Sequence, residues 1–221
     1  MPETPSGTSL HPLIGLSPSS TRLSSFLSSL SPSPASPLPP PQIASYPDIV
    51  YYNYHPLGLS LSFEPRQPYR PTYGITTRER LDEHLLTLVA IDVYNHEARL
   101  DDPKQRDKSQ PTTKPEYEPF PAYPILISHA PPSSSASEPA VFALTPTTTG
   151  AQLVAALGEP SRKGGGTTAG VGIWTEWTPD GVMVEWASGG LEAWEKGAGA
   201  VWRVLSVFER GVVKGKEEGD E

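Results

Sequence analysis

The sequence predicts an α+β protein made of two fused degenerate repeats, each a helix followed by a three- to four-stranded antiparallel sheet, with loops rich in Pro and Ser. Internal self-similarity is the first observation behind this prediction. Residues 49–63, IVYYNYHPLGLSLSF, align without a gap with residues 172–186, GIWTEWTPDGVMVEW. The second observation is that further blocks recur on either side in the same order, residues 13–21 with 141–149 and residues 91–94 with 205–208.

A helix is expected near the start of each repeat. SPSST and TPTTT supply hydroxyls that can accept the unpaired N–H groups of a first helical turn, and Pro suits the entry to a helix. The second helix places Leu153, Val154 and Leu157 on one side and ends at Gly158-Glu159-Pro160, a typical stop signal. The first, residues 22–30, is rich in Ser and weaker in helix propensity. The preceding segments LIGL and VFAL are candidate strands.

Each aromatic block predicts a β-hairpin, because alternation stops at a Pro-x-Gly turn and then resumes. VAIDVY and RVLSVF predict a third strand in each repeat. Period-two alternation assigns one set of side chains to the core: Leu59, Leu61, Phe63, Ile91, Val93, Val182, Val184, Trp186, Leu205 and Val207. The opposite face is expected to be solvated, with a mixture of polar and aromatic side chains: Tyr51, Asn53, Ser60, Ser62, Asp92, Tyr94, Trp174, Glu176, Met183, Glu185, Ser206 and Phe208.

These patterns divide the chain into five parts. We expect a flexible N-terminus over residues 1–11, repeat 1 over 12–95, an irregular Pro/Ser-rich connector over 96–139, repeat 2 over 140–209 and a charged tail over 210–221. Within the connector, residues 123–128, YPILIS, are expected to form an extra strand or to cover a sheet edge. Residues 191–196 are expected to form a short helical turn.

The composition excludes several classes of site. The 221 residues include no cysteine, which excludes disulfides, a thiol nucleophile and Cys-ligated zinc or iron–sulfur centres. The net charge of −8 gives no overall attraction to nucleic acid. No apolar run approaches the roughly 20 residues that span a bilayer. Arg22 is the only basic side chain of the first 41 residues, which is too few for a typical mitochondrial presequence. We therefore expect a cytoplasmic protein, with the nucleus as the alternative.

The sequence predicts no metal site and no cofactor. Its five histidines, His11, His55, His84, His96 and His129, have no metal-ligand spacing with one another or with carboxylates. Residues 161–168, SRKGGGTT, reverse the order of a phosphate-binding loop, in which the glycines precede the Lys. We interpret this stretch as a connector with two solvated charges.

One pair of acids permits a catalytic hypothesis. Glu176 and Glu185 are expected on paired hairpin strands, and two carboxylates about 5–9 Å apart can hydrolyse a glycosidic bond. The matching residues of the first hairpin are Asn53 and Ser62, and nothing else in the sequence indicates a sugar site. Two exposed acids on a solvated sheet face are the alternative interpretation.

Two resemblances follow from these motifs. A helix ending in L-G-x-P, followed by an aromatic hairpin and an I-x-V strand, is similar to β-lactamase-inhibitor-protein-like folds. In those folds helices pack on one face of an antiparallel sheet and leave the other face open. The stretch from Asp48 to Phe63, followed by AIDVYN, also resembles the phagosome assembly factor family, which has D-G-I-x-L-x-F followed by I-E-V-Y-D. Neither family is a class of enzymes. The resemblance implies binding through the open sheet face and assigns no individual residue.

The leading functional hypothesis is a non-catalytic interaction or adaptor module that binds another protein through this face. The residues expected to contact the partner are Tyr51, Asn53, Trp174, Glu176 and Glu185, with no catalytic residue among them. The alternative is a small-ligand binder or hydrolase-type enzyme with a site between the repeats that uses Glu176 and Glu185. A third hypothesis is an accessory protein with phosphorylation sites at Ser-Pro pairs: Ser17, Ser31, Ser33 and Ser36. The sequence predicts no oligomeric state.

Overall fold

The computed structural model describes residues 6–31, 37–95, 116–129, 140–165, 172–187 and 197–211. These residues form eleven strands and two α-helices, so the described part of the chain is mostly β. The helices are α1 (Thr21–Ser29) and α3 (Gly150–Leu157). The strands are β1 (Thr8–Ser9), β2 (Gln42–Ser45), β3 (Val50–Tyr54), β4 (Leu59–Pro65), β5 (Leu86–Tyr94), β6 (Ile125–His129), β7 (Ala140–Leu144), β8 (Arg162–Gly164), β9 (Trp174–Trp177), β10 (Val182–Trp186) and β11 (Trp202–Phe208).

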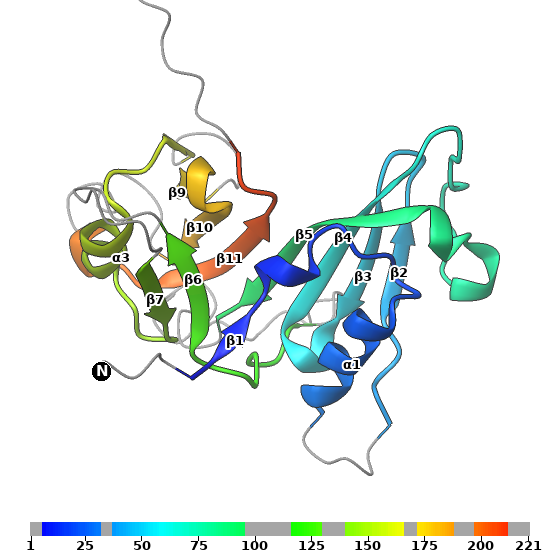
Figure 1. The fold of residues 1–221 in the computed structure, drawn as a ribbon, viewed down its shortest axis with the longest axis horizontal. Helices are drawn as coiled ribbons and strands as arrows, with labels where there is room; N and C mark the ends of the chain where they lie inside the picture. Colours follow the sequence, from blue (N-terminus) through cyan, green and yellow to red (C-terminus); the bar gives the residue numbers. More distant parts are fainter. Residues whose placement is uncertain are drawn as a thin grey trace, which may run out of the picture.

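Eight of these strands form one antiparallel sheet in the order β2-β3-β4-β5-β11-β10-β9-β8. Its centre is the pairing of β5 with β11, in which Val93 lies opposite Leu205 and Asp92 opposite Ser206. A smaller sheet has the order β1-β6-β7, with β1 parallel to β6 and β6 antiparallel to β7. Both α-helices and the small sheet lie on the same side of the large sheet (Figure 1).

The predicted fold class is wrong. The strands do not form two helix-plus-sheet repeats, because β5 and β11 pair with each other and merge the two sets of strands into one sheet of eight. The described part of the chain is mostly β, since its two α-helices have only 9 and 8 residues. The physical reason is that each third strand offers a free backbone edge, and the two edges satisfy each other's N–H and C=O groups.

The two segments that precede the helices, LIGL and VFAL, also differ from each other. VFAL lies in β7, as a strand of the small sheet, whereas LIGL begins in the single-turn 3₁₀ helix His11–Leu13 and forms no strand. Residues 123–128 were expected as a strand, and β6 covers most of this range. Arg162 and Lys163, expected in a solvated connector, lie instead in the edge strand β8.

The predicted local elements form for the expected reasons. Helix α3 begins with a capping box, in which Thr149 and Gln152 satisfy each other's backbone N–H groups, and it ends at Gly158. Each hairpin turns through a one-turn 3₁₀ helix that contains Pro, followed by a glycine with positive φ: Gly58 (φ 58°) and Gly181 (φ 63°). Only glycine adopts this left-handed conformation without strain.

One hydrophobic core lies between the large sheet and the elements that cover it. All ten side chains that the alternation assigns to the core are buried. Leu23 and Leu27 of α1 join this core, as do Leu153 and Leu157 of α3. No helix among the described residues is long and apolar enough to cross a membrane. Several predicted features lie outside the described residues: the helical turn at 191–196, the end of the charged tail, His96, Ser33 and Ser36.

Candidate binding face of the large sheet

The face of the large sheet that points away from the core, called here the second face, carries a row of polar residues. Directly opposed residues of an antiparallel pair share a face, so the strand register defines the row. From β2 to β8 it consists of Gln42, Asn53, Ser60, Asp92, Ser206, Met183, Glu176 and Arg162. Met183 is its only apolar member. This polar row crosses the entire sheet.

The centre of the polar row is a carboxylate on β5. Asp92 Oδ1 accepts a hydrogen bond from Ser206 Oγ at 2.6 Å. Burial raises the pKa of Asp92; the Ser206 bond opposes this shift, and the negative charge of Glu185 adds to it. A carboxyl group in the middle of the sheet, with no cation among these causes, is therefore easier to protonate than an exposed one.

At one end of the polar row, Asn53 is already engaged. Its Oδ1 accepts hydrogen bonds from Ser60 Oγ at 2.8 Å and from Tyr117 Oη at 2.9 Å. Tyr117 belongs to residues 116–120, called here the strap, which lie against this part of the second face. Residues 123–128, expected to form an extra strand or to cover a sheet edge, lie mostly in β6, with Ile125 and Ile127 in the core.

At the other end, Glu176 is held by its own neighbours. One carboxylate oxygen lies 3.3 Å from Arg162 Nη1, and the other accepts a hydrogen bond from Thr178 Oγ1 at 2.8 Å. The Arg162 guanidinium also lies over the ring of Trp174, 5.8 Å from its centre. Glu176 is therefore a buried structural acceptor, whereas its partner Arg162 is 66% exposed.

All five predicted partner-binding residues lie on the second face, but in two separate groups. Tyr51 and Asn53 belong to β3. Trp174 and Glu176 belong to β9, and Glu185 lies on β10 directly opposite Trp174. In the strand order β10 lies four and β9 five spacings from β3, so the groups are about 19–24 Å apart along the sheet. The register thus assembles two aromatic-polar patches and not one site.

The first group extends into a cluster of exposed tyrosines that the sequence did not single out. Tyr46, in the β2–β3 turn, meets Tyr51 edge to face at 6.1 Å and Tyr73 at 5.5 Å. Tyr73 is 72% exposed and Tyr46 40% exposed. The two loops are tied together, because Gly74 N–H donates to Ser45 O at 2.9 Å. The rings therefore stand on a fixed platform at one end of the second face.

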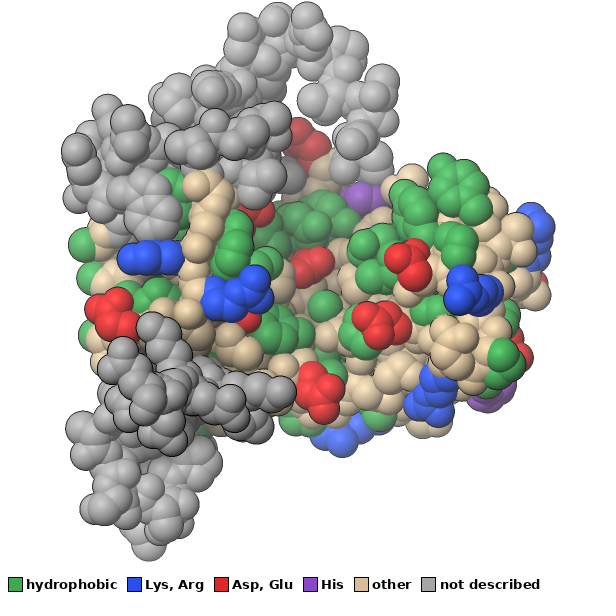
Figure 2. Space-filling model, turned by 90° about the horizontal axis from the view of Figure 1, so that it is seen from above, with side chains coloured by type: hydrophobic (Ala, Val, Ile, Leu, Met, Phe, Trp, Pro, Cys, Tyr) green, Lys and Arg blue, Asp and Glu red, His purple; other side chains and the backbone are tan. Residues whose placement is uncertain are grey.

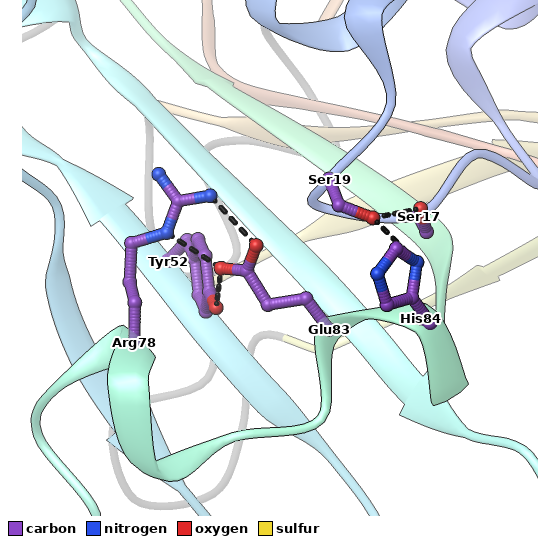
Figure 3. Close-up of polar contacts among 6 residues, drawn as sticks. All are labelled: Ser17, Ser19, Tyr52, Arg78, Glu83 and His84. Carbon is purple, nitrogen blue, oxygen red and sulfur yellow. Dashed lines mark hydrogen bonds and ion pairs between the residues drawn. The ribbon is translucent and has the colours of Figure 1, made fainter.

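A separate polar cluster joins the loop before β5 to the core side of the sheet (Figure 3). The Tyr52 hydroxyl donates to Glu83 Oε1 at 2.8 Å, and the Arg78 guanidinium binds both carboxylate oxygens of Glu83. Burial alone would raise the pKa of Glu83, but the hydrogen bonds from Arg78 and Tyr52 outweigh it and hold the pKa below its usual value. Because each group satisfies another, this cluster fixes the loop.

The same loop carries a weaker polar contact, between His84 Nδ1 and Ser19 Oγ at 3.2 Å, with Ser17 Oγ a further 3.0 Å from Ser19 Oγ (Figure 3). A cavity of about 670 Å³ opens here, and its charged lining consists of Arg78, Glu79, Arg80, Asp82, Glu83 and His84. This lining contains three acids and two arginines, and Arg78 and Glu83 pair with each other, so it has no strong preference for a ligand of either charge.

A second cavity, of about 640 Å³, lies where the N-terminal segment meets β5, β6 and the end of β11. Its polar lining includes Ser9, His11, Thr87, Ser128, Glu209 and Arg210. His11 Nε2 lies 3.3 Å from Gly181 O, and Arg210 donates to Ser128 O at 2.9 Å. Burial, reinforced by Arg210, lowers the pKa of His11. The His11 contact joins the N-terminal segment to the second hairpin, and the Arg210 contact joins the residues after β11 to β6.

Other side chains contact both acids of the catalytic alternative. Glu176 is held by Arg162 and Thr178, and Glu185 Oε1 lies 3.8 Å from Arg203 Nη1. Neither acid lines the two cavities described above. Across the described residues, no group of three or more His, Asp or Glu side chains is placed to hold a metal ion. No observation thus favours a hydrolase site at Glu176 and Glu185.

The sequence signals for the site differ in strength. Asp92 was assigned to this face but not to the site, although an acid inside the aliphatic alternation of β5 could have marked it. Tyr117 gave no signal, because it lies in a stretch rich in Pro and charge.

Comparisons with known proteins add nothing: no protein-family model, curated protein or solved structure matches the chain. The two family resemblances therefore stay predictions.

Proposed function

We propose that the protein is a non-catalytic interaction module that binds another protein through the second face of its large sheet. The observation that carries this proposal is that partly exposed aromatic side chains, Tyr51, Trp174 and Phe208, flank the polar row on a face away from the helices. Protein interfaces combine such aromatic anchors with satisfied polar groups. The other face of the sheet is closed by α1, α3 and the small sheet (Figure 1).

Charge supports a protein partner over nucleic acid. The net charge is −8, and the polar row contributes two acids and one base. In the view of Figure 2, the basic side chains of the described residues stand apart from one another and alternate with acidic and hydrophobic ones. Nucleic-acid binding faces carry clustered Lys and Arg around their aromatic rings. A cytoplasmic or nuclear location is part of the same proposal.

Site-specific photo-crosslinking in cells tests the proposal. A benzophenone amino acid is placed at Tyr51, at Trp174 or, as the control, at Arg22, which is exposed on α1 on the opposite side of the sheet. The expected result is one protein crosslinked from both sheet positions and not from Arg22. With that protein purified, Trp174→Ala is expected to weaken binding at least tenfold in calorimetry, and Arg22→Ala by less than twofold.

Two results would remove the sheet face from consideration. One is a partner crosslinked from Arg22 alone. The other is equal affinity of the wild type and a folded Tyr51→Ala/Trp174→Ala double variant for the crosslinked protein. A tagged full chain, followed by microscopy and fractionation, tests the location independently of the partner.

A further inference from the structure

The strap places one aromatic side chain in a defined slot on the second face. The ring of Tyr117 stacks on Tyr94 with 3.7 Å between ring centres and 8° between planes. The His55 ring lies 4.3 Å from it on another side. The Tyr117 hydroxyl donates to Asn53 Oδ1 at 2.9 Å. Tyr94, His55 and Asn53 thus surround the ring of Tyr117 and contact both its flat face and its hydroxyl.

A buried side chain and a main-chain hydrogen bond hold the strap in place. Phe120 is only 2% exposed and belongs to the hydrophobic core. Between Phe120 and the slot, Glu118 N–H donates to His55 O at 2.8 Å. The strap also passes directly over Gly58, where a Cβ atom would collide with Glu118 O. The second face therefore already binds a polypeptide, through a main-chain hydrogen bond and an inserted aromatic side chain.

The surroundings of the slot select an uncharged phenol. Burial raises the pKa of the Tyr94 hydroxyl, and Asp92 raises it further. The pKa of Tyr117 is also raised, mainly by burial. A phosphorylated tyrosine or a carboxylate in this place would be repelled by Asp92. A phenylalanine would stack but would leave Asn53 Oδ1 without one donor.

Resting on the function proposed above, we propose that this slot is the recognition subsite for an unphosphorylated tyrosine in an extended segment of the partner, and that Tyr117 occupies it in the free protein. The partner tyrosine replaces Tyr117 on Tyr94 and donates to Asn53. The strap stays attached through Phe120, so the slot opens without disturbing the core. Asn53 is then a residue of the subsite, as the sequence predicted, while Tyr94 and His55 are added to it.

The purified chain is sufficient for the test. Tyr117→Ala empties the slot, and the probes are 4-methylphenol, toluene and an acetylated, amidated hexapeptide of residues 114–119, KPEYEP. Binding is measured by two-dimensional NMR titration. The variant is expected to bind 4-methylphenol at least tenfold more tightly than the wild type does, with shifts at Tyr94, His55 and Asn53. Toluene is expected to bind at least threefold more weakly than 4-methylphenol.

Matched variants and peptides isolate the hydroxyl contact. In Asn53→Ala/Tyr117→Ala, the preference for 4-methylphenol over toluene is expected to be smaller than in Tyr117→Ala, because the Tyr94 and Ser60 hydroxyls remain as hydrogen-bond partners. The hexapeptide is expected to bind Tyr117→Ala, its Phe version more weakly, and its Ala and phosphotyrosine versions not at all. Should Tyr117→Ala fail to fold, Tyr117→Phe serves instead. This variant keeps the ring stack on Tyr94 and loses the hydrogen bond to Asn53. Its strap is therefore easier to displace, and the hexapeptide is expected to bind Tyr117→Phe at least threefold more tightly than it binds the wild type.

The outcomes separate the two proposals. A folded Tyr117→Ala that shows no shift at Tyr94 with any phenol probe, or equal affinity for 4-methylphenol and toluene, overturns the tyrosine subsite. Crosslinking of a partner to Trp174 with such a negative result would leave the binding face in place and remove only the slot. A phenol-binding slot in a protein whose sheet face crosslinks nothing would keep the slot and remove the protein partner.

Discussion

The hairpins β3–β4 and β9–β10 share a backbone plan and differ in what lies over them. Each strand pair turns through one Pro-containing 3₁₀ turn and a left-handed glycine. After each turn, the neighbouring third strand bonds to that glycine: Tyr94 N–H donates to Gly58 O, and Phe208 N–H to Gly181 O. The strap covers the first turn, whereas the second is covered by Phe208 itself and by His11.

The polar groups of the two hairpins differ in the same way. In the first, the Asn53–Ser60 pair receives a third partner, Tyr117, from a distant segment. In the second, Glu176 is satisfied by Arg162 and Thr178, which lie within the same group of strands. The comparison teaches that one hairpin is completed by a distant segment of the chain and the other by its own neighbouring residues. Under our proposal, a partner binds the first hairpin by replacing the contacts of the strap, whereas at the second it contacts Trp174 without replacing any segment.

The largest effect is expected from the two turn glycines. Gly181→Ala should lower the free energy of unfolding by about 3 kcal/mol, of which about 1–2 kcal/mol comes from the left-handed backbone and the rest from the clash with Phe208 O inside the sheet. Gly58→Ala should cost about 2 kcal/mol, because its clashes are with Glu118 O and Phe120 N of the strap, which lies outside the sheet and is expected to yield more easily than a sheet strand. Chemical denaturation of both variants measures the difference.

Gly74→Ala is the control for this comparison, because Gly74 has φ 79° and nothing within 4 Å of an added Cβ. It isolates the backbone strain, expected at about 1 kcal/mol. Equal losses for Gly58→Ala and Gly181→Ala would contradict the view that only the first turn has a movable cover.

The aromatic residue that ends the first strand of each hairpin gives the next effect. Trp177 Nε1 donates to Gly158 O at the end of α3, at 2.8 Å, and its side chain is buried. Trp177→Phe should cost about 2 kcal/mol through lost volume and an unpaired carbonyl. Tyr54→Phe, the matched change in the first hairpin, removes one oxygen and should cost about 1 kcal/mol or less. Thermal unfolding ranks the two, and a larger loss for Tyr54→Phe would reverse the assignment of the second hairpin as the structural one.

Local sequence patterns predicted these hairpins, but they could not predict the pairing of strands that lie far apart in the sequence. Alternation at Leu59, Leu61 and Phe63 is a property of neighbouring residues, so the buried face followed from the sequence. The union of β5 with β11 joins residues 114 positions apart at Asp92 and Ser206, and either strand edge alone is compatible with many partners. That missing step produced the wrong fold class.

For the candidate site, as for the fold, the sequence predicted the face on which each residue lies but not the long-range arrangement. Its five residues lie on the expected face because period two assigns faces, but their division into two groups depends on the central strand pair. Nothing in the local pattern distinguishes Asn53, bound to Tyr117, from Glu176, bound to Arg162. The strap itself follows a stretch with no hydrophobic alternation, and its position depends on Phe120 reaching the core.

A pH-dependent effect is expected where the two halves meet, at Asp92. Its folded-state pKa is raised by burial, so its contribution to stability is fully present below its unfolded pKa of about 4. That contribution is lost as the pH rises through the folded-state value. Asp92→Asn keeps the acceptor for Ser206 and removes the charge. It should therefore stabilise the protein at pH 7 by on the order of 1 kcal/mol.

Thermal unfolding of Asp92→Asn and wild type between pH 4 and pH 8 checks the sign. The difference should shrink toward pH 4, where both side chains are neutral. The opposite linkage of Glu83, whose pKa is lowered by its partners, is present in both proteins and cancels in the difference. A variant less stable than wild type at pH 7 would show that the Asp92 charge is satisfied.

The smallest effect is expected at the outer edge of the second hairpin. Arg162 is 66% exposed, and its guanidinium lies 3.3 Å from Glu176; ion pairs this exposed contribute about 0.2–1 kcal/mol. Arg162→Gln should therefore lower stability by about 0.5 kcal/mol and leave Thr178 as a donor to Glu176. Denaturation at low and at high salt measures it, and the loss should be smaller at high salt because screening already weakens the pair. A salt-independent loss above about 1 kcal/mol would mean that Glu176 depends on Arg162 as Asn53 depends on Tyr117. In that case the two hairpins would be alike in needing an outside partner, and β8 would be the second hairpin's counterpart to the strap.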